Sequence, residues 1–390
     1  MKILVVIPAY NCKDTIVNTI HSVLNQSVNH EIDVIIVDDA STDITPNILS
    51  TFKDKVFIHT NPINLGVSES RNIALKIKDI NTFDYIAFCD SDDIWQCDHL
   101  QKQIDFLTDN NFDIVCSVPK CIDSKYNEVA LFGGINYTEI NKANLLQFNR
   151  VYISSIVTLP KVINTVGEFD CLLDGVEDWD YWIRSLKAGY RFGMNTDSTI
   201  KYLVKDNGMA AISKDKNTLF RRKNPIKLNL GCGTEHLEDY LNCDLYAPGS
   251  DLKFDAAKID LNDNQVDEIR AYHLIEHFDF HKIFAVLKEW HRVLKNGGLL
   301  VLETPDFLNS CKRFAEGNEE LRQKLYGHFF AWPWLDGQTH KFLFTEDQLK
   351  WTLEQCGFTN IIRVQADSIY AKDNNQIADI YLKVVANAVK

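Results

Sequence analysis

Apolar and polar residues follow two alternating patterns along the first part of the chain. Short apolar runs of strand length recur at residues 2–8, 33–37, 56–59 and 84–88. Between them, apolar residues recur at helical spacing over residues 15–24, 45–52 and 69–77. Strands that are apolar throughout and alternate with helices predict a doubly wound, parallel α/β sheet buried on both faces. Because ligands of such sheets bind beyond the carboxyl ends of the strands, polar residues at those ends are the first candidates for a site.

A second alternation begins after residue 226. The segment RRKNPI at 221–226 interrupts the pattern, and its proline and charges are typical of a linker or a domain boundary. Apolar runs then return at 227–233, 240–245, 266–272 and 299–305, with a helical run at 284–294. The sequence therefore predicts an α/β protein of two tandem Rossmann-like domains, residues 1–222 and 223–390.

Composition and charge narrow the class of protein. Of the 390 residues, 45% are hydrophobic and 24% are charged, as in an ordinary globular protein. No apolar run reaches the ~18–20 residues of a membrane span, and the amino terminus lacks the features of a signal peptide. The net charge of −13 argues against a nucleic-acid-binding protein. Ten scattered cysteines without an export signal predict reduced thiols and a cytoplasmic location.

Carboxylates follow two of the predicted strands in the first domain. The second strand ends in VDDASTD (37–43) and the fourth in FCDSDD (88–93). Carboxylates crowded at one sheet edge repel one another unless a cation shares them, and Mg²⁺ or Mn²⁺ takes oxygen ligands from one or two aspartates plus phosphate. The alternative is that aspartates such as Asp43 and Asp93 cap helices, and either explanation fits each residue taken singly.

Five motifs of the first half, taken together, are more specific. They are VVIPAYN (5–11), VDDASTD (37–43), NLGVSESRNIAL (64–75), CDSDD (89–93) and GVEDWDYWIR (175–184). In this order and spacing they closely resemble glycosyltransferase family 2, over residues 1 to about 215. The resemblance implies a GT-A fold, a nucleotide-diphosphate sugar donor, a divalent metal such as Mn²⁺ or Mg²⁺, and transfer with inversion at the sugar carbon.

The resemblance also implies how the donor is held. The nucleobase and ribose are expected beside Pro8, Tyr10, Asp38 and Asp39. Arg71, which follows the NxG loop, is expected to approach the base or the phosphates.

The remaining implied roles concern the metal and the chemistry. Asp90 and Asp92 form the D-x-D motif at the donor diphosphate, with Asp92 the expected direct metal ligand. Asp178, in the Glu-Asp pair, matches the catalytic base, although acids there would also favour the start of a helix. The segment KYLVKDNGMAA (201–211) departs from the YRxH-like pattern of many relatives, so Lys205 is expected to replace a histidine as a phosphate contact.

The second domain opens with an apolar strand, a glycine-rich turn and a strand that ends in an acid, KLNLGCGTEHLEDYLNCDL. Gly231 and Gly233 permit a tight turn and close approach of a ligand, and Asp244 suits both hydroxyls of a ribose. Together with the segments at 266–278, 287–306 and 336–358, this resembles a class I S-adenosylmethionine-dependent methyltransferase over residues 226–385. The resemblance implies that the cofactor binds at these residues and that Asp255 accepts from the adenine amino group.

The string HLIEH at 273–277 also fits the zinc-peptidase pattern H-x-x-E-H. That pattern requires both histidines in one helix, whereas RAY before His273 belongs to a predicted strand, and no third ligand is evident from the sequence. We therefore expect His273 and His277 not to bind zinc but to line the methionine end of the cofactor or the acceptor pocket. Either one, or His340, is a candidate base for a sugar hydroxyl, and a purely structural histidine is the alternative for each.

The two resemblances together imply a bifunctional transferase that adds a sugar to a glycan or lipid-linked glycan and methylates a sugar hydroxyl. Association with the cytoplasmic face of a membrane is compatible with such an acceptor. The first alternative is that only one domain is active and the other is a docking module. The remote alternative is a zinc hydrolase that uses HLIEH.

Overall fold

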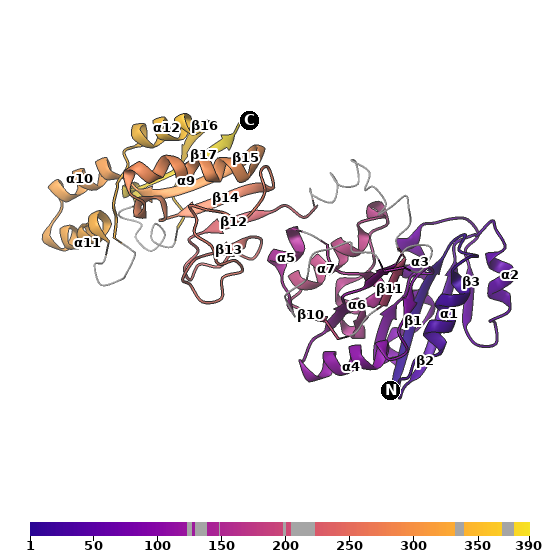
Figure 1. Ribbon diagram of the computed structural model, residues 1–390. Helices are drawn as coiled ribbons and strands as arrows, with labels where there is room; N and C mark the ends of the chain where they lie inside the picture. The colour runs from indigo at the N-terminus through magenta and orange to yellow at the C-terminus, as the bar shows by residue number, and fades with distance from the viewer. Residues whose placement is uncertain are drawn as a thin grey trace. The chain divides into compact units, whose positions relative to one another are not determined.

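The computed structural model describes residues 1–122, 127–128, 139–147, 149–197, 200–203, 223–331, 339–368 and 378–390. The chain forms two compact units, Met1–Asn224 and Pro225–Lys390, each built around its own sheet (Figure 1). The predicted boundary between residues 222 and 223 lies at the edge of a stretch outside the described residues, 204–222, and stays a prediction.

The first unit begins with the predicted alternation of strands and helices. Its four leading strands are β1 (Lys2–Ala9), β2 (Glu31–Asp38), β3 (Phe57–Thr60) and β4 (Tyr85–Phe88). The connecting helices are α1 (Ile16–Leu24), α2 (Thr45–Ser50) and α3 (Val67–Ile77), followed by the short 3₁₀ helix η1 (Ile80–Thr82). The strands pair in parallel in the order β3-β2-β1-β4. Residues 3–9 of β1 are all buried, which explains why this strand is apolar throughout.

The rest of this sheet is mixed rather than purely parallel as predicted. The two-residue strand β9 (Val157–Thr158) lies antiparallel between β4 and β6 (Ile114–Ser117), followed by β10 (Phe192–Asn195) and β8 (Glu139–Ile140). A small second sheet contains β5 (Ile94–Trp95), β11 (Ile200–Leu203) and β7 (Lys120–Ile122). The helices here are α4 (His99–Asp109), α5 (Lys142–Gln147), η2 (Ile153–Ser155), α6 (Pro160–Val166), η3 (Cys171–Leu173) and α7 (Glu177–Lys187).

The second unit contains a six-stranded sheet in the order β13-β12-β14-β15-β17-β16. The strands are β12 (Lys227–Leu230), β13 (Leu241–Cys243), β14 (Val266–Tyr272), β15 (Leu294–Pro305), β16 (Phe358–Val364) and β17 (Tyr381–Ala388). The first four are parallel, and β17 is antiparallel to both of its neighbours. The helices are η4 (Ile275–His277), α9 (Phe280–Val293), α10 (Phe307–Glu316), α11 (Glu319–Phe330), α12 (Glu346–Gln355) and η5 (Ala378–Ile380). Both units are therefore α/β, as predicted.

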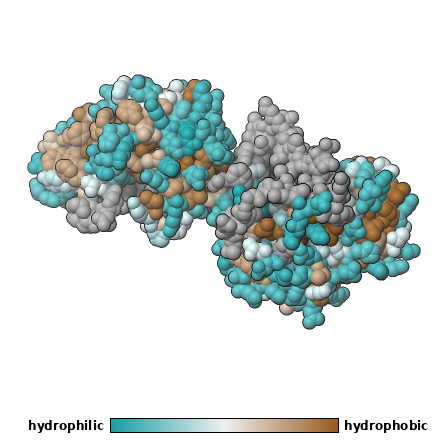
Figure 2. Space-filling model, viewed as in Figure 1, coloured by the Kyte–Doolittle hydropathy of each residue, from teal (hydrophilic) through white to brown (hydrophobic). Residues whose placement is uncertain are grey.

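The face shown in Figure 2 has polar residues over much of its area and apolar residues in both units. On α10, Phe307 and Leu308 are exposed. In the part of the chain that the structure describes, no helix combines the length and the apolar character that a membrane crossing requires.

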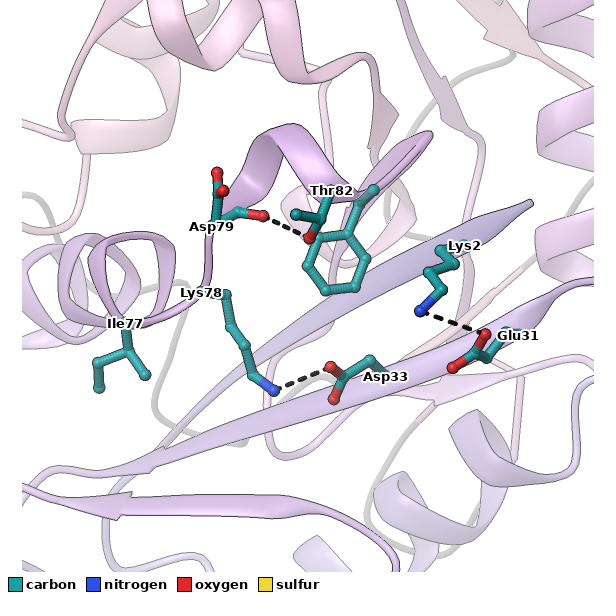
Figure 3. Close-up of a pocket in the computed structure, with 8 residues that line it drawn as sticks. Lys2, Glu31, Asp33, Ile77, Lys78, Asp79 and Thr82 are labelled. Carbon is teal, nitrogen blue, oxygen red and sulfur yellow. Dashed lines mark hydrogen bonds and ion pairs between the residues drawn. The ribbon is translucent and has the colours of Figure 1, made fainter.

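A polar hollow lies at the amino ends of β1 and β2, where Lys2 and Glu31 are the paired first residues (Figure 3). Its charged side chains pair with one another, Lys2 with Glu31 at 3.5 Å and Lys78 with Asp33 at 2.8 Å. The predicted carboxylates follow the opposite, carboxyl ends of these strands. The hollow therefore does not belong to the candidate site.

Candidate functional site

A buried arginine joins two of the predicted motifs in the first unit. Arg71 lies on α3 with only 2% of its side chain exposed. Its Nη2 donates to Asp90 Oδ1 at 2.8 Å, and its Nη1 donates to Glu177 Oε1 at 2.7 Å. Asp90 follows β4 and Glu177 begins α7. This contact brings the D-x-D motif and the Glu-Asp pair, which are far apart in sequence, into one site.

The charge of Arg71 is maintained by its two partners. Burial opposes a charged guanidinium, but the carboxylates of Asp90 and Glu177 hold the pKa of Arg71 above its usual value. Burial also limits its access to a ligand. The geometry gives Arg71 a positioning role for both carboxylates, and the direct contact with the donor that we expected stays a prediction.

The carboxylates after β4 are crowded. The backbone N–H of Asp90 donates to Ser154 Oγ at 2.9 Å, which fixes the turn, and the Asp90 side chain is 31% exposed. Asp93 is buried and accepts from the Leu203 backbone N–H at 3.3 Å. Burial, and then the charges of Asp92 and Asp90, raise the pKa of Asp93 well above its usual range. A cation shared by Asp90 and Asp92 would relieve this repulsion.

Neither aspartate is the N-cap residue of a helix, because the N-cap of α2 is Ile44, but Asp43 still contacts the start of that helix. Asp43 Oδ1 accepts from the backbone N–H of Thr45, the first residue of α2, at 2.8 Å. Asp93 precedes the strand β5 rather than a helix, so it caps none.

The two aspartates that end β2 have different surroundings. Asp39 is buried, and its carboxylate accepts from Asn61 Nδ2 and from the backbone N–H groups of Leu65 and Gly66, at 2.8–2.9 Å. It therefore shapes the loop before α3. Asp38 is also buried, but its Oδ2 has no hydrogen-bond partner among the described residues. An orphaned buried carboxylate oxygen is costly and is suited to accept an N–H from a ligand.

The other expected donor contacts differ in exposure. Pro8 is buried near the end of β1, whereas Tyr10 follows the strand with 48% of its surface exposed. Lys205 lies outside the described residues. The donor contacts of these three residues stay predictions.

Asp178 is the second residue of α7, which confirms that the Glu-Asp pair begins a helix, and its role as the base stays a prediction. Its Oδ1 accepts from the Trp179 backbone N–H at 2.6 Å, and its Oδ2 accepts from Asn149 Nδ2 at 3.2 Å. Burial, and then the adjacent carboxylate of Glu177, raise the pKa of Asp178 to about 7. A carboxylate with a raised pKa, held in a fixed direction, is a more effective proton acceptor than an ordinary aspartate.

The glycine-rich turn of the second unit has the predicted form. Gly231 and Gly233 follow β12 with φ angles of 63° and 51°, a region that favours glycine. The Gly233 N–H donates to Asp244 Oδ2 at 3.0 Å, just beyond β13. A Cβ at Gly231 would lie 2.8 Å from Leu274 Cδ1. A side chain at Gly231 would therefore require Leu274 to move, in addition to occupying space at the turn.

Asp244 is already well supplied with donors. Besides Gly233, the backbone N–H groups of Tyr246 and Ala247 donate to its Oδ1 at 2.8 Å. Burial acts to raise the pKa of Asp244, but these backbone donors hold it below its usual value. Asp255 is exposed and accepts from the Ala257 N–H at 2.9 Å in a turn. The ribose and adenine contacts of the two acids stay predictions.

His273 lies between two buried carboxylates. It follows β14 with a φ of 51°, its Nδ1 is 3.3 Å from Glu276 Oε1, and its Nε2 is 3.4 Å from Glu303 Oε1. Burial acts to lower the pKa of His273, but these two carboxylates raise it to about 9. A protonated imidazole cannot accept a proton, so the geometry favours a positioning role over the base that we expected.

The structure also decides how HLIEH folds. His273 follows a strand and His277 ends the short η4, so the two do not share a helix, as the sequence argument required. A different group of possible metal ligands, which the sequence spacing did not indicate, lies in this loop region. One ligand atom each from Glu276, His277 and His340 lies within 4.8 Å of the other two. The cluster does not include His273.

Sequence reasoning missed Glu303 and Asn149. Glu303 is fully buried in β15, and the available signal was an acid within an otherwise apolar strand. Asn149 carried no signal, because its contact with Asp178 depends on the fold.

Comparison with known families identifies two domains along the chain. The family model for glycosyl transferase family 2 matches residues 4–157, and a methyltransferase domain model matches residues 205–362. The chain thus carries the domains of an enzyme with both activities.

Individual relatives match part of the chain. The UDP-Glc:alpha-D-GlcNAc-diphosphoundecaprenol beta-1,3-glucosyltransferase WfaP of Escherichia coli is 30% identical over 236 residues, 60% of this chain and 88% of that protein. The putative teichuronic acid biosynthesis glycosyltransferase TuaG of Bacillus subtilis is 40% identical over 110 residues, 27% of this chain and 42% of that protein. A crystal structure of S. aureus TarS 1-349 in complex with UDP-GlcNAc is 19% identical, with a TM-score of 0.48 and coverage of 61% of this chain and 68% of that one. The chain belongs to glycosyltransferase family 2 and carries a methyltransferase domain as its second part.

Proposed function

We propose that the first unit transfers a sugar, with inversion, from a nucleotide-diphosphate sugar to an acceptor hydroxyl, and that the second unit methylates a sugar hydroxyl. The observation that carries the first part is the double ion pair of Arg71 with Asp90 and Glu177. It holds the D-x-D motif beside the segment that contains the candidate base, Asp178.

Our inference about the donor and the acceptor has two supports: the name of a relative, and a buried carboxylate oxygen of Asp38 that has no hydrogen-bond partner among the described residues. The E. coli relative is named for UDP-Glc and for an acceptor linked to diphosphoundecaprenol. The buried Asp38 Oδ2 offers an acceptor for an N–H of a nucleobase. We infer a nucleotide-diphosphate sugar donor and a lipid-linked glycan acceptor, reached from the cytoplasmic face of a membrane.

A divalent metal fits the residues after β4. Asp90 and Asp92 would hold it, and Mn²⁺ or Mg²⁺ there would neutralise the charge that develops on the leaving diphosphate. Asp178 takes the proton of the acceptor hydroxyl, and Asn149 directs its Oδ2. The acceptor oxygen then attacks the anomeric carbon from the face opposite the diphosphate, in a single displacement.

S-adenosylmethionine fits the glycine turn of the second unit. The turn at Gly231 and Gly233 lets a ligand approach the backbone at the carboxyl end of β12, and Asp244 supplies the acid at the end of β13. The sulfonium of the cofactor supplies an activated methyl group. The acceptor hydroxyl has to lose its proton, and His277 and His340 lie in the loop region at the carboxyl end of β14.

The proposal is tested on the full chain with radiolabelled sugar nucleotides, a lipid-linked acceptor and Mn²⁺. Asp92→Asn should abolish sugar transfer, and Asp178→Asn should lower it by roughly 10²–10⁴-fold. Asp109→Asn, which changes an exposed carboxylate on α4, is the control. Calorimetry with S-adenosylmethionine tests the second unit in the same proteins. If only one of the two activities is present in wild type, the chain is a one-domain enzyme with a docking module.

A further inference from the structure

We propose that Glu276, His277 and His340 form a binding site for a divalent transition metal of the Zn²⁺ type in the second unit. Nothing in the expected cofactor set of the methyltransferase domain calls for such an ion. It is distinct from the proposed metal at Asp90 and Asp92, which has only carboxylate ligands.

The three ligand atoms are already close together. They lie within 4.8 Å of one another, and the rings of His277 and His340 are 5.1 Å apart at their centroids. Bond lengths of about 2.1 Å place tetrahedral ligands roughly 3.4 Å apart, so binding requires an inward movement of at most about 1.4 Å. Side-chain rotation of two partly exposed histidines can supply that movement.

Each histidine has one ring nitrogen beside a backbone carbonyl. His277 Nδ1 lies 3.4 Å from the carbonyl of Thr339, and His340 Nδ1 lies 2.9 Å from the carbonyl of His328. A carbonyl only accepts, so Nδ1 carries the hydrogen in each ring and Nε2 carries the lone pair. Metal-binding histidines commonly have this arrangement, in which a backbone carbonyl fixes the tautomer.

The third ligand is held by its own partners. Glu276 is fully buried, accepts from Thr304 Oγ1 at 3.0 Å and contacts His273. Its backbone carbonyl accepts from the N–H groups of Lys341 and Phe342, which tie the His340 segment to this loop. Hydrogen-bonded carboxylates of this kind are typical of the surroundings of metal ligands.

The ligand set selects the class of ion. Imidazole nitrogens suit Zn²⁺ and Co²⁺, whereas Mg²⁺ and Ca²⁺ prefer oxygen ligands alone. Two histidines and one glutamate leave a fourth coordination position open, as in catalytic zinc sites. An oxygen of a substrate or of water can occupy that position.

The role that we assign to the open coordination position of the metal rests on the methyl transfer proposed above. The loop that carries the site begins with Leu274, which packs against Gly231 in the cofactor turn. The acceptor hydroxyl would bind the metal, release its proton to water, and form its bond to the methyl carbon as the sulfur–carbon bond breaks. The products are the methyl ether, S-adenosylhomocysteine and one proton. In this arrangement the metal, rather than a histidine base, makes the hydroxyl nucleophilic.

Co²⁺ added to the full chain is a direct probe, because its visible absorption reports nitrogen ligands and a low coordination number. We expect one Co²⁺ per chain with that spectrum, displaced by Zn²⁺. His277→Ala and His340→Ala should each weaken Co²⁺ binding by more than the roughly 10–100-fold typical of losing a hydrogen-bonded partner of a ligand. His281→Ala, an exposed histidine on α9, and Asp92→Asn in the first unit should leave the spectrum unchanged.

Two further measurements separate the possible failures. Circular dichroism identifies any histidine variant that does not fold. In that case Thr304→Val is tested instead, and it should lower Co²⁺ affinity by about 10–100-fold. A Co²⁺ spectrum unaffected by either histidine variant overturns the site. Paramagnetic broadening of the S-adenosylmethionine methyl proton signal, absent in His340→Ala, supports the role in methyl transfer. Bound Co²⁺ without broadening overturns that role, and failure of S-adenosylmethionine to bind refutes the proposed function instead.

Discussion

Removal of the guanidinium that joins the two motifs of the first unit should be costly. In Arg71→Leu, the carboxylate of Glu177, whose side chain is 6% exposed, would be left buried without its cation. Breaking a buried ion pair by removing one partner typically costs about 3–5 kcal/mol. Asp90 is 31% exposed and can regain water, so most of this loss should come from Glu177. We therefore expect the first unit to lose about 3–5 kcal/mol of unfolding free energy, together with sugar transfer.

A second substitution separates stability from activity. In the double variant Arg71→Leu with Glu177→Gln, residue 177 carries no charge that needs a cation. The glutamine oxygen can still accept from the Gly175 N–H, a hydrogen bond of 2.5 Å in wild type. Replacing both charges of a buried pair is often close to neutral in free energy. The double variant should thus recover most of the lost stability. It should not recover sugar transfer, because Asp90 still lacks the partner that holds it.

The measurement has to resolve the two units, because a two-state analysis of the whole chain is not justified. Urea unfolding can be monitored by hydrogen exchange, read out on peptides from each unit. The change in unfolding free energy is then assigned to residues 1–224 or to residues 225–390. Lys76→Leu is the matched control on the same helix, since its ion pair with Glu168, at 3.0 Å, is exposed on both sides. Exposed pairs contribute about 0–1 kcal/mol. If Arg71→Leu costs no more than Lys76→Leu, the reasoning is wrong.

Other predictions concern the metal, the base and the glycine turn. Asp92→Asn should abolish Mn²⁺-dependent sugar transfer and leave the calorimetric heat of S-adenosylmethionine binding unchanged. Wild-type transfer should decline as the pH falls below about 7, where Asp178 becomes protonated, and a pH–rate profile of Asp178→Asn should lack that limb and lie roughly 10²–10⁴-fold lower. Gly231→Val should abolish S-adenosylmethionine binding, measured by calorimetry, because valine at a φ of 63° also strikes Leu274.

The sequence was sufficient to predict the principal strands and the sheet edge at which the acidic motifs lie. Apolar runs of four to eight residues gave β1, β2, β12 and β14 close to their observed bounds, because burial on both faces leaves little choice of residue. Acids directly after such strands, such as Asp90 and Asp244, then lie at the carboxyl edge. Short strands were harder to predict, and β9, with two residues, carries no pattern that distinguishes it from a loop.

The contacts between distant segments were beyond sequence reasoning. The family resemblance implied that Arg71 approaches the donor, but nothing in the sequence indicated its ion pair with Glu177. In the sequence nothing distinguished His340 from the other histidines. In the structure the N–H groups of Lys341 and Phe342 donate to the Glu276 carbonyl, so the His340 segment lies beside Glu276. In both cases one-dimensional spacing contains no information about which polar groups share a buried space.

The two sites place a buried cation between two carboxylates, although their sequences are unrelated. Arg71 lies between Asp90 and Glu177, and His273 lies between Glu276 and Glu303. A carboxylate without a partner in such surroundings would shift its pKa and lose its charge, and the cation prevents that. Each cation balances only one of its two carboxylates, so one negative charge remains in each group. That remaining charge, increased by Asp92 in the first unit and joined by His277 and His340 in the second, is what a divalent ion would neutralise.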